Sequence, residues 1–252
     1  MVFIIVGFSG CSSKKIEPSN EVFLSESSSE DEELDDFEDE LEIKDIYDPF
    51  SGYNRVMTSF NDNAYEYILK PIANGYSYIF HKEIRLSVDK FFHNIYFPVR
   101  FVNNLLQGKF YNVYEESGRF VINTTIGLLG FFDPAKSKFN LQAHNEDFGQ
   151  TLGFYGVGSG PHIVIPLLGP SNLRDAISFY PDSFVSTIHL TKRNYWTLTD
   201  TIEEFIAIKS LEKINTTSLY MSEYDKLKAD AVDLYPYLRD VYEQHRDKLI
   251  EE

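Results

Sequence analysis

Phe148-Gly-Gln-Thr-Leu-Gly-Phe-Tyr-Gly-Val-Gly-Ser-Gly-Pro-His-Ile-Val-Ile-Pro-Leu-Leu-Gly-Pro-Ser-Asn-Leu-Arg-Asp175 is the stretch around which the rest of the chain is organised. Glycines and prolines alternate here with short apolar runs, which is typical of turns and extended segments and not of a helix core. The glycines of Gly156–Gly160 permit backbone angles that other residues avoid, and Pro161 then starts an extended run from His162 to Leu168. The stretch predicts a short β-hairpin or a gate-like loop.

The segment before this stretch has helical periodicity. Asp48 followed by Pro49 is a good helix start, with an N-cap residue and a proline at the first helical position. From Phe50 to Ile68, apolar residues recur every three or four positions and form one broad stripe, and Pro71 ends or kinks the helix. Periodicity does not decide whether such a helix covers a core or lies flat in a membrane interface. The opposite face carries Asn54, Arg55, Asn61 and Asp62.

Further helices are expected on both sides of the glycine-rich stretch. The pattern predicts helices at Pro71–Phe80, at Ile84–Gln107 with a break near Pro98, at Phe110–Gly127, from about Asp175 to Leu190, at Asn194–Ile214, and at Met221–Leu249 with an interruption at Pro236. A loop is expected from Ala135 to Asn145, after Gly127, Gly130 and Asp133-Pro134.

The net charge of −16 is concentrated near the N-terminus. Most of it comes from Glu26–Asp45, and the chain from Ile46 onward is only mildly acidic, without a cluster of Lys and Arg. This composition argues against a nucleic-acid partner. Aromatic residues make up 15% of the chain, which suits the boundary between hydrocarbon and water and equally a phenylalanine-rich soluble core.

The N-terminus carries features of a processed leader. Val2–Phe8 is too short to span a bilayer but suits the apolar region of a signal peptide, and Phe8-Ser9-Gly10-Cys11 resembles a lipobox, where bacterial lipoproteins are cleaved and acylated on the cysteine. Phe8 stands where leucine is usual, and no basic residue precedes the apolar run. We therefore expect a signal peptide at residues 1–10 and lipidation at Cys11; the alternative is a free thiol. Ser12 after the cysteine implies sorting to the outer membrane by analogy.

Residues 11–46 are expected to form a disordered tether. The segment is serine-rich and then strongly acidic, so repelling charges and scarce apolar surface favour an extended chain. A calcium-binding tract is the alternative, but the glycine-containing loop of an EF-hand is missing. Residues 47–250 are the expected helical domain.

Polar residues interrupt the apolar helix predicted at Phe110–Gly127. Arg119, Asn123, Thr124 and Thr125 alternate with apolar positions and form a stripe that can line a passage. Alternatively, Thr124 and Thr125 bond to their own backbone and Arg119 pairs with Glu115 or Glu116. The residues leave both interpretations open.

Four segments of the chain can be compared with known families: Asp48–Arg55, Phe97–Gly108, Arg119–Asp133 and the glycine-rich stretch. In order and spacing, over roughly residues 47–250, they resemble the MlaA/VacJ family of outer-membrane phospholipid-transport lipoproteins. The resemblance implies a mainly α fold: a ring-like bundle of amphipathic, membrane-embedded helices with a short β-hairpin, preceded by a disordered tether. It implies an outer-membrane lipoprotein of a Gram-negative bacterium, lipid-anchored and embedded from the periplasmic side.

The implied activity is removal of mislocalised phospholipid from the outer leaflet through an amphipathic channel. A periplasmic lipid carrier would receive the lipid, and a trimeric porin is an expected partner. The candidate channel residues are Arg119, Asn123, Thr124 and Thr125; the candidate gate residues are Gly156, Gly158, Gly160 and Pro161; structural roles are expected for Asp48, Pro49, Asn54, Arg55, Arg174 and Asp175.

Other chemistries find little support in the sequence. The six histidines show no metal-binding spacing, and no P-loop or nucleophile elbow occurs, so no cofactor, metal or catalysis is expected. Two rival classes remain. A lipid hydrolase would use Ser159 with His162, and a purely structural outer-membrane anchor would need no channel.

Overall fold

The computed structural model describes residues 48–190 and 197–252. Its elements, in chain order, are α2 (Ser51–Ala64), the π-helical turn η1 (Tyr65–Leu69), α3 (Lys70–Ile79), α4 (Lys82–Ile95), α5 (Phe97–Leu106), α6 (Phe110–Thr125), α7 (Pro134–Phe139), α8 (Phe148–Phe154), β1 (His162–Ile165), β2 (Gly169–Asn172), α9 (Leu173–Val185), α10 (Ile202–Asp230) and α11 (Leu234–Glu251). The mainly helical prediction is confirmed. The expected signal peptide, Cys11 and the tether lie outside the described residues.

The predicted hairpin is present, with shorter strands than the extended run suggested. β1 and β2 pair antiparallel, with His162 opposite Asn172 and Ile165 opposite Gly169. The turn after Ile165 uses left-handed backbone angles at Leu167 (φ 62°) and Gly169 (φ 102°). Pro166 lacks an N–H and so ends the first strand.

The start of the quoted stretch is helical, contrary to the expectation of turns. A capping box begins α8: the Gln150 N–H donates to Asp147 Oδ1 at 2.8 Å, and the Asp147 N–H donates to Gln150 Oε1 at 2.8 Å. Such a cap satisfies N–H groups that would otherwise be unpaired at the helix start, and so supports a short helix that contains glycine.

Other helix boundaries can be compared with the prediction at Asp48, Pro71 and Asp133. α2 begins at Ser51, with Phe50 and not Asp48 at the N-cap position, because the first helical bond runs from the Asn54 N–H to the Phe50 carbonyl (2.8 Å). At Pro71, where an end or a kink was expected, the π-helical turn η1 ends at Leu69 and α3 begins at Lys70, within one residue of the helix predicted at Pro71–Phe80. Part of the expected loop after Asp133 is helix α7, because the Asp133 carboxylate accepts the Lys136 N–H.

The two C-terminal helices divide at a different place from the one predicted. α10 runs without interruption through Asn215–Ser218, where the sequence suggested a break. Asn215, Thr217 and Ser218 are buried, so tertiary contacts override their weak helix propensity. The break lies at Ala231–Asp233, and Asp233 caps α11 by accepting the Tyr235 N–H. Pro236 therefore sits in the first turn of α11, where proline is tolerated.

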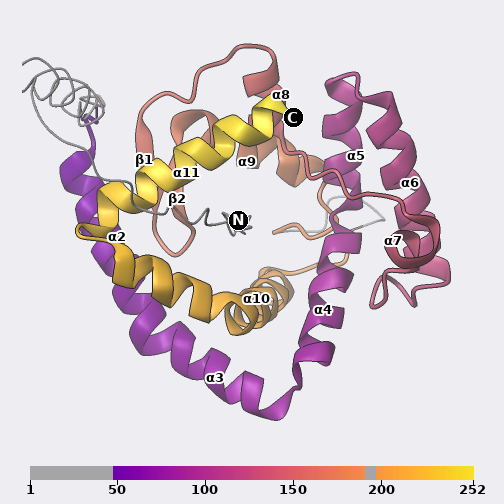
Figure 1. The fold of residues 1–252 in the computed structure, drawn as a ribbon, viewed down its shortest axis with the longest axis horizontal. Helices are drawn as coiled ribbons and strands as arrows, with labels where there is room; N and C mark the ends of the chain where they lie inside the picture. Colours follow the sequence, from indigo (N-terminus) through magenta and orange to yellow (C-terminus); the bar gives the residue numbers. More distant parts are fainter. Residues whose placement is uncertain (1–47, 191–196) are drawn as a thin grey trace, which may run out of the picture. The chain divides into compact units, whose positions relative to one another are not determined.

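Contacts between the elements of Phe50–Glu252 close into a ring (Figure 1). α2 continues through η1 into α3, which packs on α10; α10 packs on α4; α4 leads to α5; α5 contacts α8 and α9; and α11 joins α8 back to α2. The hairpin contacts α2, α9 and α11, while α6 and α7 pack outside α5. The ring-like arrangement that the family resemblance implied is confirmed.

Burial in this ring is inverted relative to an ordinary soluble protein. Most of the buried side chains in the described residues are polar or charged, and large apolar side chains are widely exposed. On α2 the fully buried residue is Asn54, whereas Val56 is 61% exposed and Phe60 49%. Since soluble proteins normally bury such apolar stripes, the outward face of α2 indicates an apolar environment around the ring. Among the described residues, no helix has both the length and the apolar character needed to cross a bilayer.

Candidate functional site

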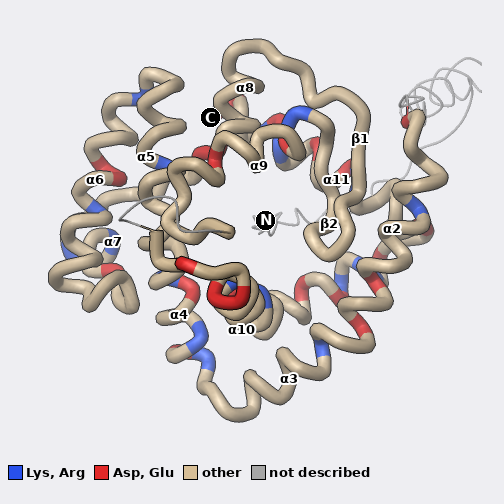
Figure 2. Tube along the Cα trace, turned by 180° about the vertical axis from the view of Figure 1, so that it is seen from behind, with Lys and Arg blue, Asp and Glu red and all other residues tan. Residues whose placement is uncertain are grey.

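Residues 148–173 contain no Asp, Glu, Lys or Arg. This segment forms α8, the glycine loop Tyr155–Pro161 and the hairpin, and its trace carries no charge colour in Figure 2, whereas charged residues recur along the surrounding helices. The segment lies where α2, α9 and α11 meet. An uncharged, glycine-rich loop with charged and polar neighbours is the first part of the candidate site.

Two asparagines of α2 hold the hairpin in place. The Asn54 amide donates to the His162 carbonyl at 2.9 Å, and its oxygen accepts the Val164 N–H at 2.9 Å. Two turns along the helix, the Asn61 amide donates to the Ile165 carbonyl at 3.0 Å and its oxygen accepts the Leu167 N–H at 2.7 Å. The two side chains therefore bond to the backbone N–H and C=O groups on the free edge of β1, as a neighbouring strand would.

The glycine loop is bonded to the start of α9. The Leu173 N–H donates to the Pro161 carbonyl and the Arg174 N–H to the Ser159 carbonyl, both at 3.0 Å. Arg174 Nη1 also reaches the Val157 carbonyl at 3.3 Å. Gly156 (φ 85°) and Gly160 (φ 68°) adopt angles that favour glycine, and a Cβ at Gly156 or Gly158 would meet open space.

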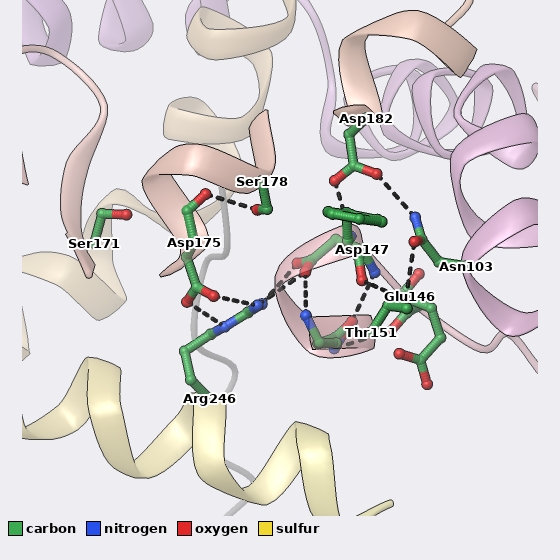
Figure 3. A network of polar contacts seen from close by, with 12 residues as sticks. Asn103, Glu146, Asp147, Thr151, Ser171, Asp175, Ser178, Asp182 and Arg246 are labelled. Atoms are coloured by element: carbon green, nitrogen blue, oxygen red, sulfur yellow. Dashed lines mark hydrogen bonds and ion pairs between the residues drawn. The ribbon is translucent and has the colours of Figure 1, made fainter. Parts of the chain in front are cut away.

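Beneath this loop, a buried arginine connects three helices (Figure 3). Arg246 of α11 donates to both carboxylate oxygens of Asp147 at 2.7 and 2.8 Å, and its Nε lies 2.8 Å from Asp175 Oδ2. The Tyr242 hydroxyl donates to the same Asp175 oxygen at 2.7 Å, and Arg174 Nε to the other at 2.9 Å. Burial opposes the charge of Arg246, but its bonds to Asp147 and the charges of both aspartates outweigh this and raise its pKa.

A second set of contacts extends from α8 and α9 to α5. Asp182 accepts the Phe148 N–H at 3.0 Å and the Asn103 amide at 2.8 Å, and the Thr151 hydroxyl donates to Asn103 Oδ1 at 2.9 Å. Burial raises the pKa of Asp182 to about 6, although both hydrogen bonds favour the carboxylate.

The contacts of Arg246 and of Asp182 together join α5, α8, α9 and α11 (Figure 3). We call Asn103, Asp147, Thr151, Asp175, Asp182 and Arg246 the polar hub. It holds in place the two helices, α8 and α9, that flank the glycine loop and the hairpin.

The four candidate channel residues lie in the C-terminal half of α6. Arg119 donates to the Leu141 carbonyl at 2.7 Å and pairs with Asp133 at 2.8 Å, so its ionic partner is neither Glu115 nor Glu116. Asn123 also bonds to Asp133, at 2.9 Å. Thr124 accepts from the Asn94 amide, and Thr125 bonds to the Val121 carbonyl of its own helix at 2.7 Å. A channel-lining role for the four stays a prediction.

The residues expected to be structural differ in burial. Asn54 and Asp175 are buried and bonded as described, whereas Arg55 forms an exposed ion pair with Asp233 at 2.5 Å and lines a pocket of about 440 Å³ between α2 and the α10–α11 connection. Sequence reasoning missed Arg246, Asp147 and Asn103. The spacing of Asp147 and Gln150 is that of a capping box and could have predicted the start of α8. No local pattern identifies Arg246, because its partners lie far away in the sequence.

Ser159 and His162 do not form a nucleophile–base pair in the described chain. His162 is 5% exposed, and its Nδ1 lies 2.8 Å from Glu243 Oε1. Its Nε2 is buried without a hydrogen-bond partner, and Ser159 bonds to α9 through its carbonyl. Across residues 48–190 and 197–252, no group of His, Cys, Asp and Glu is arranged to hold a metal ion.

Comparison with known proteins gives consistent results. Residues 46–249 match the family model described as MlaA lipoprotein. The chain is 32% identical over 207 residues to an uncharacterized protein of Rickettsia typhi (strain ATCC VR-144 / Wilmington), covering 82% of this chain and 79% of the relative. It is 32% identical over 203 residues to the intermembrane phospholipid transport system lipoprotein MlaA of Escherichia coli (strain K12), covering 79% and 77%.

The fold also matches a solved structure. The match has a TM-score of 0.67 and 29% sequence identity, and covers 81% of this chain and 98% of the other. The matched structure concerns the structural basis for maintenance of bacterial outer membrane lipid asymmetry.

Proposed function

The chain belongs to the MlaA lipoprotein family, and from this premise we propose that it removes mislocalised phospholipid from the outer leaflet of the outer membrane. The lipid would pass through an amphipathic channel in the helical ring to a periplasmic carrier. The protein would act passively, with energy supplied elsewhere in the pathway, because its sequence contains no P-loop for ATP.

The inverted burial of the ring carries this proposal. A two-chain phospholipid that leaves a bilayer for water exposes on the order of 30 CH₂ groups, each costing about 0.8 kcal/mol. A protein that takes the lipid directly from the outer leaflet must therefore lie in the membrane, where the chains stay out of water, and must offer a polar path for the headgroup. Apolar side chains that face outward from α2, with buried polar side chains at the helix contacts, match the first requirement.

Polar contacts between the helices suit a ring that lies in lipid. Hydrocarbon offers no hydrogen bonds to polar groups, so polar side chains in lipid bond to one another and hold the helices together. Three contacts of the ring illustrate this: Tyr76 to Asn215 joins α3 to α10 (3.1 Å), Arg100 to Glu116 joins α5 to α6 (2.8 Å), and Arg246 to Asp147 joins α11 to the start of α8.

In this proposal the glycine loop is the gate. The loop is uncharged, its carbonyls are bonded to Leu173 and Arg174, and Gly156 and Gly158 have open space around them. Release of these few bonds would move the loop without disturbing the polar hub below it. The channel residues Arg119, Asn123, Thr124 and Thr125, the carrier and a trimeric porin partner belong to the same proposal.

Deletion of the gene, followed by measurement of phospholipid in the outer leaflet, tests this function. We expect surface phospholipid to rise and to return to normal when the wild-type chain is restored. The Ser159→Ala variant should restore it equally well, whereas a lipid hydrolase that uses Ser159 would lose its activity. Unchanged surface phospholipid in the deletion strain would contradict the proposal and favour a structural anchor.

A further inference from the structure

The turn that follows α6 displays large apolar side chains on a strained backbone. We call Ile126–Phe132 the apolar turn. Leu128 (φ 53°) and Leu129 (φ 60°) both adopt left-handed angles, which cost free energy for any residue with a side chain, and both are exposed (62% and 60%). Two consecutive leucines in this conformation persist only because the surrounding structure imposes it.

Hydrogen bonds hold the apolar turn in this shape. The N–H groups of Gly127, Leu129 and Gly130 donate to the last carbonyls of α6, those of Ile122, Thr124 and Asn123, at 2.8–3.1 Å. These carbonyls would otherwise need water at the helix end. The Phe132 N–H bonds back to the Gly127 carbonyl at 2.9 Å.

A buried asparagine of α4 supports the turn from below. The Asn94 amide donates to the Leu129 carbonyl at 3.2 Å and to the Thr124 hydroxyl at 3.0 Å. Gly130 (φ 98°) lies so close that a Cβ there would overlap the Asn94 side chain. The turn is therefore rigid, and its display of leucine and phenylalanine does not depend on a flexible loop.

We propose that the apolar turn inserts into lipid hydrocarbon and is the deepest point of α6 in the membrane. Residues 120–132 carry no charge, and six of the seven N–H groups of the turn, all but that of Leu128, donate to carbonyls, which lowers the cost of placing this backbone in hydrocarbon. Two of the three exposed large side chains at the start of α6 are tyrosines, Tyr111 and Tyr114 beside Phe110, whereas Val121 and Ile126 are the exposed large side chains at its end. Since tyrosine prefers the membrane interface, this order places the start of the helix at a shallower level than the turn.

This inference rests on the proposed location of the ring in a membrane, and probes at different depths can test the two separately. In the full chain with Cys11→Ser, single cysteines at Tyr111, Val121, Phe132, Lys138 and Phe60 would each be labelled with a fluorophore. Vesicles of phosphatidylethanolamine and phosphatidylglycerol would carry nitroxide quenchers at the headgroup or deep in the acyl chain. We expect depth to increase from Tyr111 to Val121 to Phe132, with Lys138 in water.

Each outcome of this experiment has one meaning. A probe at Phe132 that is quenched no more than the one at Lys138, while Phe60 on α2 is quenched, overturns the inference and leaves the membrane location standing. A Phe132 probe that is shielded from water but not quenched by lipid also overturns it, because a protein partner then covers the turn. If no position is quenched, the membrane location itself fails.

A double substitution separates membrane insertion from stability. Asparagine accepts the left-handed conformation better than leucine, so Leu128→Asn/Leu129→Asn should not lower the melting temperature in detergent. The loss of two leucines from the hydrocarbon should weaken vesicle binding of the Cys11→Ser chain by about tenfold or more. Leu105→Asn/Leu106→Asn, two exposed leucines at the end of α5, is the matched control and should weaken binding less. Equal losses in the two variants would contradict a special role for the turn.

Discussion

Arg246 donates two hydrogen bonds to the carboxylate of Asp147, across 99 residues of sequence, at 2.7 and 2.8 Å. This pair attaches the last helix to the start of α8 and so closes the ring of helices. Because the Arg246 side chain is almost fully buried, removal of its charge takes away the ionic partner of Asp147 and leaves Asp175 with only Arg174 and Tyr242.

We predict that Arg246→Ala lowers the free energy of unfolding by about 3–5 kcal/mol, the usual cost of removing one partner of a buried pair. Denaturant titration in detergent micelles measures this loss. Arg55→Ala is the control, because its pair with Asp233 is about half exposed and such pairs contribute about 0–1 kcal/mol. Equal effects of the two substitutions would show that the buried pair has no special role in closing the ring.

Gly149 lies against Arg246 and its two aspartate partners. A Cβ at this position would overlap Asp175 Oδ1 and lie 2.8 Å from Arg246 Nη2. Gly149→Ala should therefore destabilise the protein by about 1–3 kcal/mol through overpacking. Gly75→Ala, in the exposed middle of α3 with nothing nearby, should instead stabilise it by about 0.5–1 kcal/mol. Thermal melts that move in the same direction for both variants would contradict this account.

Replacement of Asn54 should release the hairpin. Asn54→Leu leaves the His162 carbonyl and the Val164 N–H without their partners, at a cost of about 2–4 kcal/mol. Hydrogen exchange at the Val164 amide should become faster in the Asn54→Leu variant, because this N–H has lost its acceptor. The exposed Asn63→Leu on the same helix should change stability by less than about 0.5 kcal/mol. Slow exchange of Val164 in the Asn54 variant would mean that the strands hold without the asparagine.

Asp182 should make the free energy of unfolding depend on pH in the mildly acidic range. Its pKa is raised from 3.8 to about 6 by burial, so between these values the folded state binds a proton more readily than the unfolded state. The contribution of this group to stability therefore falls as pH rises from about 4 to about 6 and is constant above that. Asp182→Asn should remove this part of the pH dependence in urea titrations, and the exposed Asp247→Asn should keep it. An unchanged slope in the Asp182 variant would contradict the raised pKa.

The gate proposal makes a prediction for two neighbouring glycines. Gly156→Ala forces alanine into a left-handed conformation and should cost about 1–2 kcal/mol, whereas Gly158→Ala meets open space and should be nearly neutral for stability. Both substitutions reduce backbone freedom in the loop, so both should slow removal of phospholipid from the outer leaflet by a few fold. Normal lipid removal by the stable Gly158→Ala protein would argue against a moving loop.

Much of the local structure could be predicted from the sequence. The break at Pro98 separates α4 from α5 as expected, and the glycine–proline pattern predicts the hairpin, because these residues restrict the backbone locally. Errors occurred where side chains compete with local propensity. The capping box of Asp147 makes a helix of a glycine-containing segment, and buried contacts of Asn215 keep α10 continuous.

The candidate site was only partly predictable. Asn54, Asp175 and the glycines were singled out, but the partners that give them their positions were not. The Asn54 amide bonds to residues more than a hundred positions away, and Arg246 bonds to Asp147 and Asp175, which belong to two other parts of the ring. No local pattern encodes such pairs, since they depend on how the helices pack.

By itself, the sequence determined that α2 has one apolar and one polar face, because a 3.6-residue period sorts side chains without reference to the rest of the chain. Only the tertiary structure decided which face points inward. The polar face does, because Asn54 and Asn61 bond to the hairpin, and Phe60 and Val56 are left on the outside. That choice depends on contacts between distant segments, and it leaves the apolar side chains of α2 on the outer surface of the ring.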